Sequence, residues 1–576
     1  MSQPSDNSGW KIALAVVILA ACAASAQNNT APSTPVIGSQ NTVTADPPIP
    51  RPDTSPCKVQ LFSGYAFADF SGKPFSYAPP ADCPGPWAKV VLEADFSIDA
   101  GRQFDRTANI WIGGANVYFG TTAEPSKTVA RSWHVESDLT DYSALLTMPQ
   151  SGQVILGNLV NSTYTSVLHG SADVEFYPLE RHAQPPRTAD AVLPLSAGPN
   201  GGTVALFSPS DQLSRSFTLP RNIERAYLGV YAQGQGANDE FWYACVPNNL
   251  TAELQSCAGT GFRETEITID GQPAGVAPIY PWIFTGGIDP YLWRPIPGVQ
   301  TLNFTPYRVD LTPFAGVLSN GQSHQITLSV YNDSNYFQTT ASLLLYLDHG
   351  SEQVSGEVTE NTLGSGPNPV LSTNLTTAPD GTISGTVTIT SSRRFTIAGE
   401  VKTSHGRVHT EVEQSISFSN AQQFTVSNSL FVQDITQKTN ISSLTTTNGG
   451  GGHRVDFKNS EWPLIVNISL PFNADGSFSQ ATTIEQSYRT GEAIEENGHP
   501  RYFRVISNHV APSDTLLFNS SGAVTGNQGQ ASSQRYFAAD SSGMCYSRSI
   551  TAAGGALTSV VDQARCPTQE GDDSMK

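Results

Sequence analysis

The chain has 576 residues, of which 14% are charged, and its formal net charge is −19. A field of this sign repels polyanions, so the composition argues against nucleic acid and anionic membranes as partners. The acidic balance suits a protein that works in an acidic medium, and a chain of this length predicts two or three domains.

The N-terminus has the pattern of an export signal. Lys11 precedes the apolar run 12–21, which is too short to span a bilayer comfortably, and Ala24-Ser25-Ala26 resembles a cleavage site. We therefore predict a signal peptide over 1–26 and a secreted or periplasmic protein without a membrane span. The same segment also fits a bacterial lipoprotein signal in which Cys22 is lipidated, and that alternative stays open.

The next segment, 27–56, is rich in Pro, Thr, Ser and Asn and has hardly any aromatic residues. Such a composition buries too little apolar surface to fold, so we predict a disordered leader. The six cysteines other than Cys22 fall into three pairs of near neighbours. In an exported chain this spacing predicts three disulfides: Cys57–Cys83, Cys245–Cys257 and Cys545–Cys566.

Two long stretches of the chain repeat each other. Residues Arg263–Gly271 superpose without a gap on Arg106–Gly114, and Asp310–Leu318 matches Asp138–Leu146 downstream. In both copies apolar residues alternate with polar ones, which is typical of half-buried strands. The second copy has an insertion at about 241–262.

Short alternating strands separated by Asn, Gly and Pro are typical of jelly rolls. We therefore predict an all-β fold with two adjacent antiparallel jelly-roll sandwiches, over 57–180 and 196–350. Thr, Ser, Asn and Gly dominate after His349, again with alternating runs, so 351–570 is expected to be a β-rich C-terminal domain. Two sheets packed side by side create a cleft suited to a ligand.

Asp105 and Glu240 follow matching strands in the two repeats, so pseudo-symmetric packing would bring both carboxylates to the junction. Two carboxylates in different environments can act as base and acid. Arg106 would orient Asp105 and hold it ionised, because a nearby guanidinium lowers a carboxylate pKa by roughly 1–3. The alternative reading of Asp105 and Arg106 is a plain surface ion pair.

Trp242, Trp282 and Trp293 offer flat apolar faces on which sugar rings stack, although core packing explains such residues equally well. No metal site is expected. His405 and His409 have the spacing of helical zinc ligands, but they lie in an alternating strand, where that spacing separates side chains by roughly 13 Å.

Several segments together resemble the peptide-N-glycanase A family, and in particular its acid-active bacterial branch. The segment Phe104–Ile110 also has a more distant similarity to PNGase F, a double jelly roll. The segments that carry the family resemblance are 122–125, 157–161, 225–228, 239–243, 285–295 and 311–314.

The resemblance implies hydrolysis of the amide between Asn and the innermost N-acetylglucosamine of N-glycosylated peptides or proteins, by a monomer without a cofactor. It makes Asp105 the principal catalytic residue, with Glu240 assisting and Arg106 orienting. A further assisting glutamate of PNGase F would fall near 158–160, where this chain has no carboxylate. Substrate contacts are expected from Asp239, Trp242, Arg263, Glu264, Trp282, Trp293 and Arg294.

Two other classes remain open. A carbohydrate-binding protein would keep the fold without the reaction, and a glycoside hydrolase would use the same carboxylates on a glycosidic bond. The peptide product separates the three, because only an amidase converts Asn to Asp.

Overall fold

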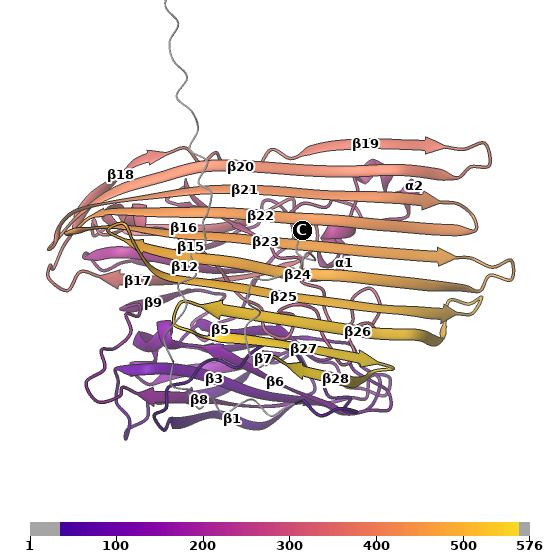
Figure 1. Ribbon diagram of the computed structural model, residues 1–576, viewed down its shortest axis with the longest axis horizontal. Helices are drawn as coiled ribbons and strands as arrows, with labels where there is room; N and C mark the ends of the chain where they lie inside the picture. The colour runs from indigo at the N-terminus through magenta and orange to yellow at the C-terminus, as the bar shows by residue number, and fades with distance from the viewer. Residues whose placement is uncertain (1–34, 564–576) are drawn as a thin grey trace, which may run out of the picture.

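The computed structural model describes residues 35–563. The molecule consists of three antiparallel β bodies: a first sandwich of eight strands, a second sandwich of nine, and one large C-terminal sheet that lies against both (Figure 1). The all-β prediction is confirmed. The predicted signal peptide, Cys22 and Cys566 lie outside the described residues.

The first sandwich consists of two four-stranded sheets, with the strand orders β1-β8-β3-β6 and β2-β7-β4-β5. A 3-10 helix, η1 (Thr140–Thr147), connects β6 to β7. The strands are β1 (Cys57–Phe67), β2 (Lys73–Tyr77), β3 (Trp87–Ile98), β4 (Thr107–Ile112), β5 (Ala115–Thr121), β6 (Arg131–Asp138), β7 (Gln150–Leu156) and β8 (Leu168–Pro178).

The second sandwich repeats this plan. Its sheets have the orders β10-β17-β12-β15 and β11-β16-β13-β14, with β9 added beside β17. Each order is that of the first sandwich with nine added to every strand number, so the internal repeat in the sequence is a repeat of topology. The strands are β9 (Ala191–Leu195), β10 (Val204–Leu206), β11 (Leu213–Thr218), β12 (Ile223–Gly234), β13 (Glu264–Ile269), β14 (Gln272–Pro278), β15 (Tyr307–Asp310), β16 (Ser323–Tyr331) and β17 (Phe337–Leu347).

The second sandwich also contains short helices. They are α1 (Ala237–Glu240), η2 (Trp242–Ala244), η3 (Asn248–Leu250) and α2 (Thr251–Leu254), and η4 (Thr312–Phe314) with α3 (Ala315–Leu318) follows β15. Of these, η2, η3 and α2 lie in the predicted insertion at about 241–262.

Strands β4 and β5 are buried on both faces, although the sequence predicts them to be half-buried. One face lies inside the first sandwich, and the other contacts the second sandwich: Phe119 packs against Tyr231 and Phe304, and the Phe304 N–H donates to the Phe119 carbonyl. The central strands of the first sandwich therefore form part of the junction between the two sandwiches. Asp105 lies two residues before the start of β4 at this junction.

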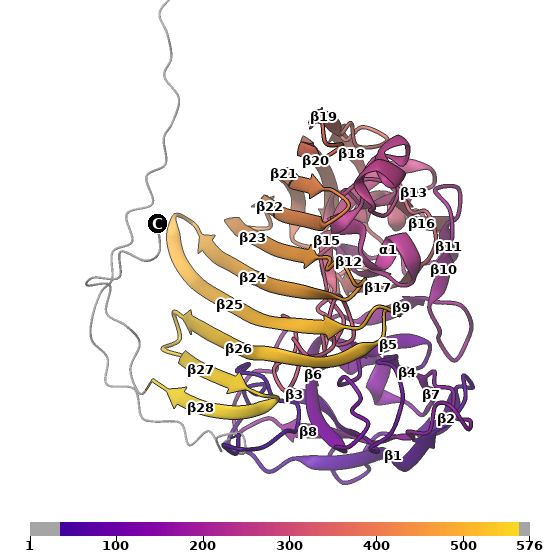
Figure 2. The same cartoon turned by 90° about the vertical axis from the view of Figure 1, so that its right-hand side faces the viewer.

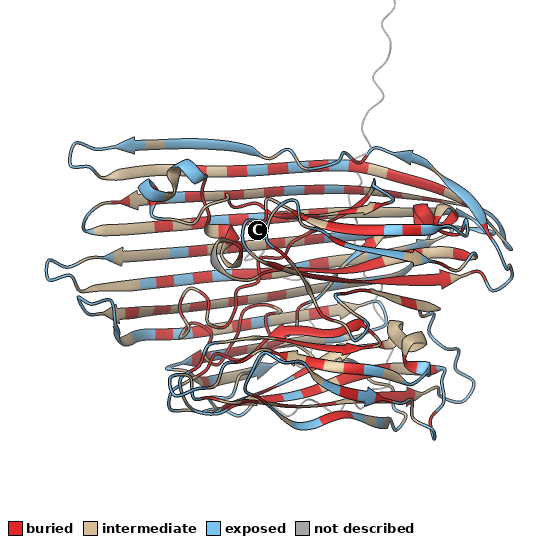
Figure 3. Ribbon diagram, turned by 180° about the vertical axis from the view of Figure 1, so that it is seen from behind, coloured by how far each residue is buried: buried red, intermediate tan, exposed pale blue. Residues whose placement is uncertain are grey.

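The C-terminal region is one eleven-stranded antiparallel sheet, whose inner face covers both sandwiches (Figure 2). Burial alternates along its strands, as Figure 3 shows by colour. The strands are β18 (Ser355–Asn361), β19 (Val370–Thr377), β20 (Ile383–Thr403), β21 (Gly406–Val426), β22 (Leu430–Gly449), β23 (Gly452–Pro471), β24 (Phe478–Glu496), β25 (His499–Phe518), β26 (Val524–Asp540), β27 (Cys545–Ala553) and β28 (Ala556–Asp562).

This sheet shares a hydrophobic core with the second sandwich. Phe395, Phe418 and Trp462 of the sheet belong to the same buried cluster as Ile267 and Phe314. A buried ion cluster crosses the same boundary, because Arg393 of β20 donates to Glu264 and Glu266 of β13. The β-rich region predicted for 351–570 is therefore no independently packed body.

The leader predicted to be disordered is packed over its described part, 35–56. Gly38 and Ser39 exchange backbone hydrogen bonds with Leu557 of β28. The Ala45 N–H donates to Gln534 of β26, and Arg51 forms ion pairs with three glutamates of the first sandwich. Backbone groups and the Arg51 side chain thus anchor a segment whose composition offers little apolar surface.

Two of the three predicted disulfides are confirmed. Cys57–Cys83 has a Cα–Cα distance of 6.2 Å, and Cys245–Cys257 has one of 4.4 Å. Cys545–Cys566 involves a residue outside the described range. Among the residues that the structure describes, no helix is long and apolar enough to cross a membrane.

Candidate active site

Asp105 lies at the junction of the two sandwiches, where the first one presents the start of β4. Its Oδ2 accepts a hydrogen bond of 3.0 Å from the backbone N–H of Gly286, in the loop of the second sandwich that follows β14. That loop is fixed to the first sandwich by the Thr285 hydroxyl, which donates to the Thr122 carbonyl. Asp105 is thus oriented by a backbone group of the opposite repeat.

Glu240 reaches the same place from the second sandwich. It ends α1, directly after β12, and its carboxyl is partly buried. The preceding residue anchors the helix: Asp239 is fully buried, pairs with Arg263 at 3.0 Å, and accepts backbone hydrogen bonds from residues 334–336. The charge of Asp105 acts on the Glu240 carboxyl, so the two groups lie within electrostatic reach of each other.

The two carboxyls interact electrostatically. Burial raises the pKa of Glu240 to about 7, and the nearby Asp105 carboxylate contributes in the same direction. Burial also raises the pKa of Asp105, while the Gly286 N–H and the Arg106 charge oppose that rise. In a mildly acidic medium Glu240 thus holds its proton and can donate it, and Asp105 is the carboxyl with groups that favour its ionised form.

Arg106 acts on Asp105 more weakly than the sequence suggests. The expected lowering of the Asp105 pKa is wrong in its net direction, because burial outweighs the guanidinium. Arg106 instead donates to Gln103 and lies over the rings of Phe70 and Phe104.

A third carboxyl, Glu124, belongs to the site, although the sequence analysis assigns it no role. It is buried, with 8% of its surface exposed, and receives a hydrogen bond of 3.1 Å from Arg294. A Cβ placed on Gly286 would lie 2.4 Å from Asp105 Oδ1 and 3.1 Å from Glu124 Oε2, so both oxygens border the same face of that glycine. Burial and the Asp105 charge raise the pKa of Glu124 well above its usual value.

The strand register explains how Glu124 reaches the site. Thr107 of β4 pairs with Thr121 of β5, so the residues just before β4 and just after β5 leave the hairpin side by side. The hairpin is readable in the sequence, and its open end would have pointed to Glu124. This chain lacks a carboxylate at 158–160, where Asn158 is fully buried and donates to backbone carbonyls.

The three tryptophans predicted to bind sugar are core residues in this structure. Trp242 is 3% exposed and packs on Phe418, and Trp282 is 8% exposed and packs on Phe304. Trp293 is 1% exposed and its Nε1–H donates to the Gly287 carbonyl, which holds the loop that positions Gly286. All three tryptophans therefore pack in the core, which is the alternative that the sequence leaves open for them.

The charged residues predicted to contact substrate divide into two groups. Asp239 and Arg263 pair with each other inside the second sandwich, and Glu264 pairs with Arg393 of the C-terminal sheet at 2.7 Å, so all three are occupied by buried partners. Arg294 differs, because it donates to Glu124 beside Asp105.

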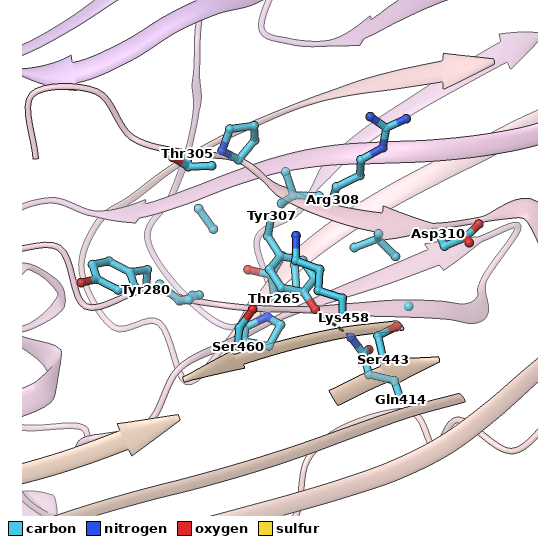
Figure 4. Close-up of a pocket in the computed structure, with 18 of the residues that line it drawn as sticks. Thr265, Tyr280, Thr305, Tyr307, Arg308, Asp310, Gln414, Ser443, Lys458 and Ser460 are labelled. Carbon is cyan, nitrogen blue, oxygen red and sulfur yellow. Dashed lines mark hydrogen bonds between the residues drawn. The ribbon is translucent and has the colours of Figure 1, made fainter. Parts of the chain in front are cut away.

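A cavity of about 130 Å³ lies away from these carboxyls, between β12, β15 and the C-terminal sheet. Figure 4 shows Tyr280, Tyr307 and Lys458 around it. Of the residues predicted from the sequence to form the site, only Trp282 lines it.

Comparisons with known proteins show what this chain is similar to. One curated relative, peptide-N4-(N-acetyl-β-glucosaminyl)asparagine amidase A from Prunus dulcis, is 34% identical over 396 residues, which are 65% of this chain and 68% of the relative. Among solved structures, PNGF-II is 13% identical with a TM-score of 0.35, covering 51% of this chain and 66% of its own. PNGase F from Flavobacterium meningosepticum is 15% identical with a TM-score of 0.32, covering 51% and 96%.

The sequence signature of one family matches residues 46–363, which include both sandwiches and all three carboxyls of the site. The chain belongs to the family described as peptide N-acetyl-β-D-glucosaminyl asparaginase amidase A.

Proposed function

We propose that this protein is a peptide-N4-(N-acetyl-β-glucosaminyl)asparagine amidase in which Asp105 and Glu240 act as base and acid. The observation that carries the proposal is the meeting of these two carboxyls, one from each sandwich, with Glu240 at a pKa of about 7. Family membership supplies the reaction.

The reaction needs a base for water and an acid for the leaving nitrogen. Asp105 would take a proton from a water molecule as the water oxygen forms a bond to the side-chain carbonyl carbon of the glycosylated Asn. Glu240 would donate its proton to the amide nitrogen as the carbon–nitrogen bond breaks. The products are a peptide with Asp in place of Asn and a glycosylamine, and no further reactant is required.

Glu124 supports this assignment as a neutral neighbour. Burial and the Asp105 charge raise its pKa and so favour its neutral form, which can donate a hydrogen bond without competing with Asp105 for positive charge. Arg294 holds its other oxygen in place. We assign Glu124 the position of a third assisting carboxyl, reached from a different strand end than the sequence comparison suggests.

An acidic working range follows from the same pairing. Glu240 must be protonated and Asp105 ionised at once, and the first condition fails as pH rises through about 7. This supports a place in the acid-active branch of the family. The two disulfides support action outside the reducing cytosol, in a secreted or periplasmic setting.

Mass spectrometry of a glycopeptide treated with the wild-type protein and with Asp105→Asn tests the proposal. The wild type should convert the glycosylated Asn to Asp, and Asp105→Asn should lower the rate about 10²–10⁴-fold, as losing a catalytic base typically does. A product that retains N-acetylglucosamine on Asn would show a glycoside hydrolase instead. A folded Asp105→Asn variant with near wild-type turnover would place the base elsewhere.

A further inference from the structure

Arg131 is a buried arginine without a direct ion pair, and Glu124 acts on it only through longer-range electrostatics. Four arginines are buried in the part of the chain that the structure describes, and Arg263, Arg393 and Arg548 each form an ion pair with a carboxylate. Arg131 is 5% exposed and forms none. Its Nη1 donates to the Gln40 carbonyl, and its Nε has no partner. A buried charge is ordinarily paired, so this arrangement indicates a site for an anion.

Arg131 borders a pocket of about 280 Å³. A water molecule takes about 30 Å³ in the liquid, so this pocket has room for a much larger group. Four separate parts of the chain build it: the leader, the first sandwich, the loop after β14, and the C-terminal sheet through β26 and the turn after β27. They contribute among others Gln40, Arg131, Tyr291, Arg294, Asn527 and Gln530.

The lining of this pocket is cationic. Two arginines contribute to it, and no aspartate or glutamate among the described residues does, in a chain whose net charge is −19. Arg294 lies over the Tyr291 ring at 4.7 Å, and its Nε, like that of Arg131, has no hydrogen-bond partner. Burial lowers the pKa of Arg131, the nearby charge of Arg294 lowers it further, and Glu124 opposes both.

The neighbouring carboxyls neutralise these charges poorly in an acidic medium. Burial raises the pKa of Glu124 well above its usual value and that of Asp289 to about 7. Both shifts favour the neutral carboxyl in an acidic medium, and a neutral carboxyl does not offset the charge of the two arginines.

Arg294 connects the pocket to the catalytic carboxyls, because its Nη2 donates to Glu124, which borders Gly286 together with Asp105. A group held in the pocket would thus belong to a molecule bound at the active site. We propose that this pocket is a subsite for a carboxylate of the glycopeptide substrate, held by Arg131 and Arg294. The proposal rests on the proposed function.

Two parts of a glycopeptide can supply a carboxylate: an acidic sugar of the glycan, or an acidic side chain of the peptide. Direct binding distinguishes them without relying on turnover. The full-length protein is titrated at pH 5 with N-acetylneuraminic acid and with N-acetylaspartic acid amide, each beside its uncharged methyl ester. We expect one of the acids to bind at least about tenfold more tightly than its ester, since charge-assisted contacts are the strong ones.

Arg131→Gln should remove this difference, and Arg131→Lys, which keeps the charge but not the forked geometry, should retain part of it. The kinetic counterpart uses glycopeptides with and without the preferred acid. Arg131→Gln should raise KM for the acidic substrate about tenfold and leave the neutral substrate unchanged.

Equal binding of acids and esters by the wild type would overturn the proposal, as would an Arg131→Gln variant that keeps the preference. Absence of glycan release by a wild type that still prefers the acid would count against the proposed function alone. Melting temperatures show whether each variant is folded. If Arg131→Gln does not fold, the acid-over-ester preference of Arg131→Lys tests the proposal: a preference equal to that of the wild type would overturn it.

Discussion

Hydrogen bonds and neighbouring charges at single residues distinguish the two carboxyls of the site, because burial raises the pKa of both. Asp105 accepts a backbone N–H and lies near the Arg106 charge, whereas Glu240 has Asp105 as its charged neighbour and a pKa of about 7. The same residue type would behave differently if the two environments were exchanged. The division of roles is therefore a property of the two local environments, and it can be tested by titration.

For Glu240→Gln we expect the alkaline limb of the kcat/KM profile, with an apparent pKa of about 7, to disappear together with most of the turnover. The loss should be smaller than for Asp105→Asn, and the double variant should lose less than the product of the two single losses, because both groups serve one transition state. Rates measured from pH 4 to pH 9 check this. An unchanged alkaline limb would assign that ionisation to another group.

Asp239 and Glu240 are neighbours in sequence with opposite expected phenotypes. Asp239→Asn leaves the buried Arg263 guanidinium without its charge partner, which typically destabilises a protein by about 3–5 kcal/mol. Glu240→Gln keeps the shape of a partly buried residue and should leave the melting temperature nearly unchanged. Thermal unfolding and turnover of the two variants separate the roles, and a stable but inactive Asp239→Asn variant would contradict the structural role of Asp239.

Glu124→Gln tests the role of Glu124, for which the sequence alone predicts no function. Gln keeps an oxygen for the Arg294 contact and an N–H donor for the site. If Glu124 acts by hydrogen bonding in its protonated form, Glu124→Gln should lower kcat about tenfold or less. Glu124→Ala should cost considerably more. If the two variants lose activity equally, Glu124 must ionise during the reaction.

At the scale of elements, the loop after β14 is the part that joins the two halves of the site. Gly286 donates to Asp105, and a Cβ at this position would lie 2.4 Å from Asp105 Oδ1. Gly286→Ala should therefore displace the carboxylate and lower turnover about 10²-fold or more, since small errors of position are costly in catalysis.

Gly491→Ala is the matched control, because a Cβ there meets nothing within 4 Å. Circular dichroism and turnover of both alanine variants measure the effect. Wild-type turnover of Gly286→Ala would show that the loop adapts, and that its contact with Asp105 does not orient the base.

The repeat in the sequence predicts much of this arrangement. Alternation over Arg106–Gly114 and Arg263–Gly271 marks β4 and β13, and the matched connections predict that Asp105 and Glu240 meet. Glu124 is found only when the two strands are also paired as a hairpin, because its position depends on the register of β4 with β5. The burial of Trp242 depends on the C-terminal sheet, whose docking no local pattern specifies.

The leader illustrates the same limit at longer range. Its composition predicts disorder, yet its backbone pairs with β28, more than 500 residues away in the sequence, and Ala45 is fully buried. Contacts of this kind arise only after both sandwiches and the C-terminal sheet have assembled. Composition describes what a segment can bury by itself, and this segment is held by surfaces that other segments provide.

The whole molecule contains several buried carboxyls whose pKa is raised, and their effects on stability add in one direction. Loss of solvation raises the pKa of Asp46 to about 6, and that of Asp289 and of Asp333 to about 7. Between pH 4 and pH 7 the folded state therefore binds more protons than the unfolded state. Stability contributed by these groups is complete below their unfolded pKa values and is lost as pH rises through the folded ones.

His134, whose pKa is raised to about 9 by Asp95 and Glu136, acts in the same direction, and His509, whose pKa is lowered, acts in the opposite one. Because carboxyls outnumber the opposing histidine, we expect the melting temperature to be several degrees higher at pH 5 than at pH 8.

Asp46→Asn should flatten this dependence, since an Asn oxygen can accept the same hydrogen bonds from Asn508 and Gln534 without titrating. The exposed Asp82→Asn should leave it unchanged. Differential scanning calorimetry from pH 4 to pH 9 measures all three proteins. A melting temperature that rises toward pH 8 would mean that the buried carboxyls are ionised in the folded state, and would remove the physical basis for an acidic working range.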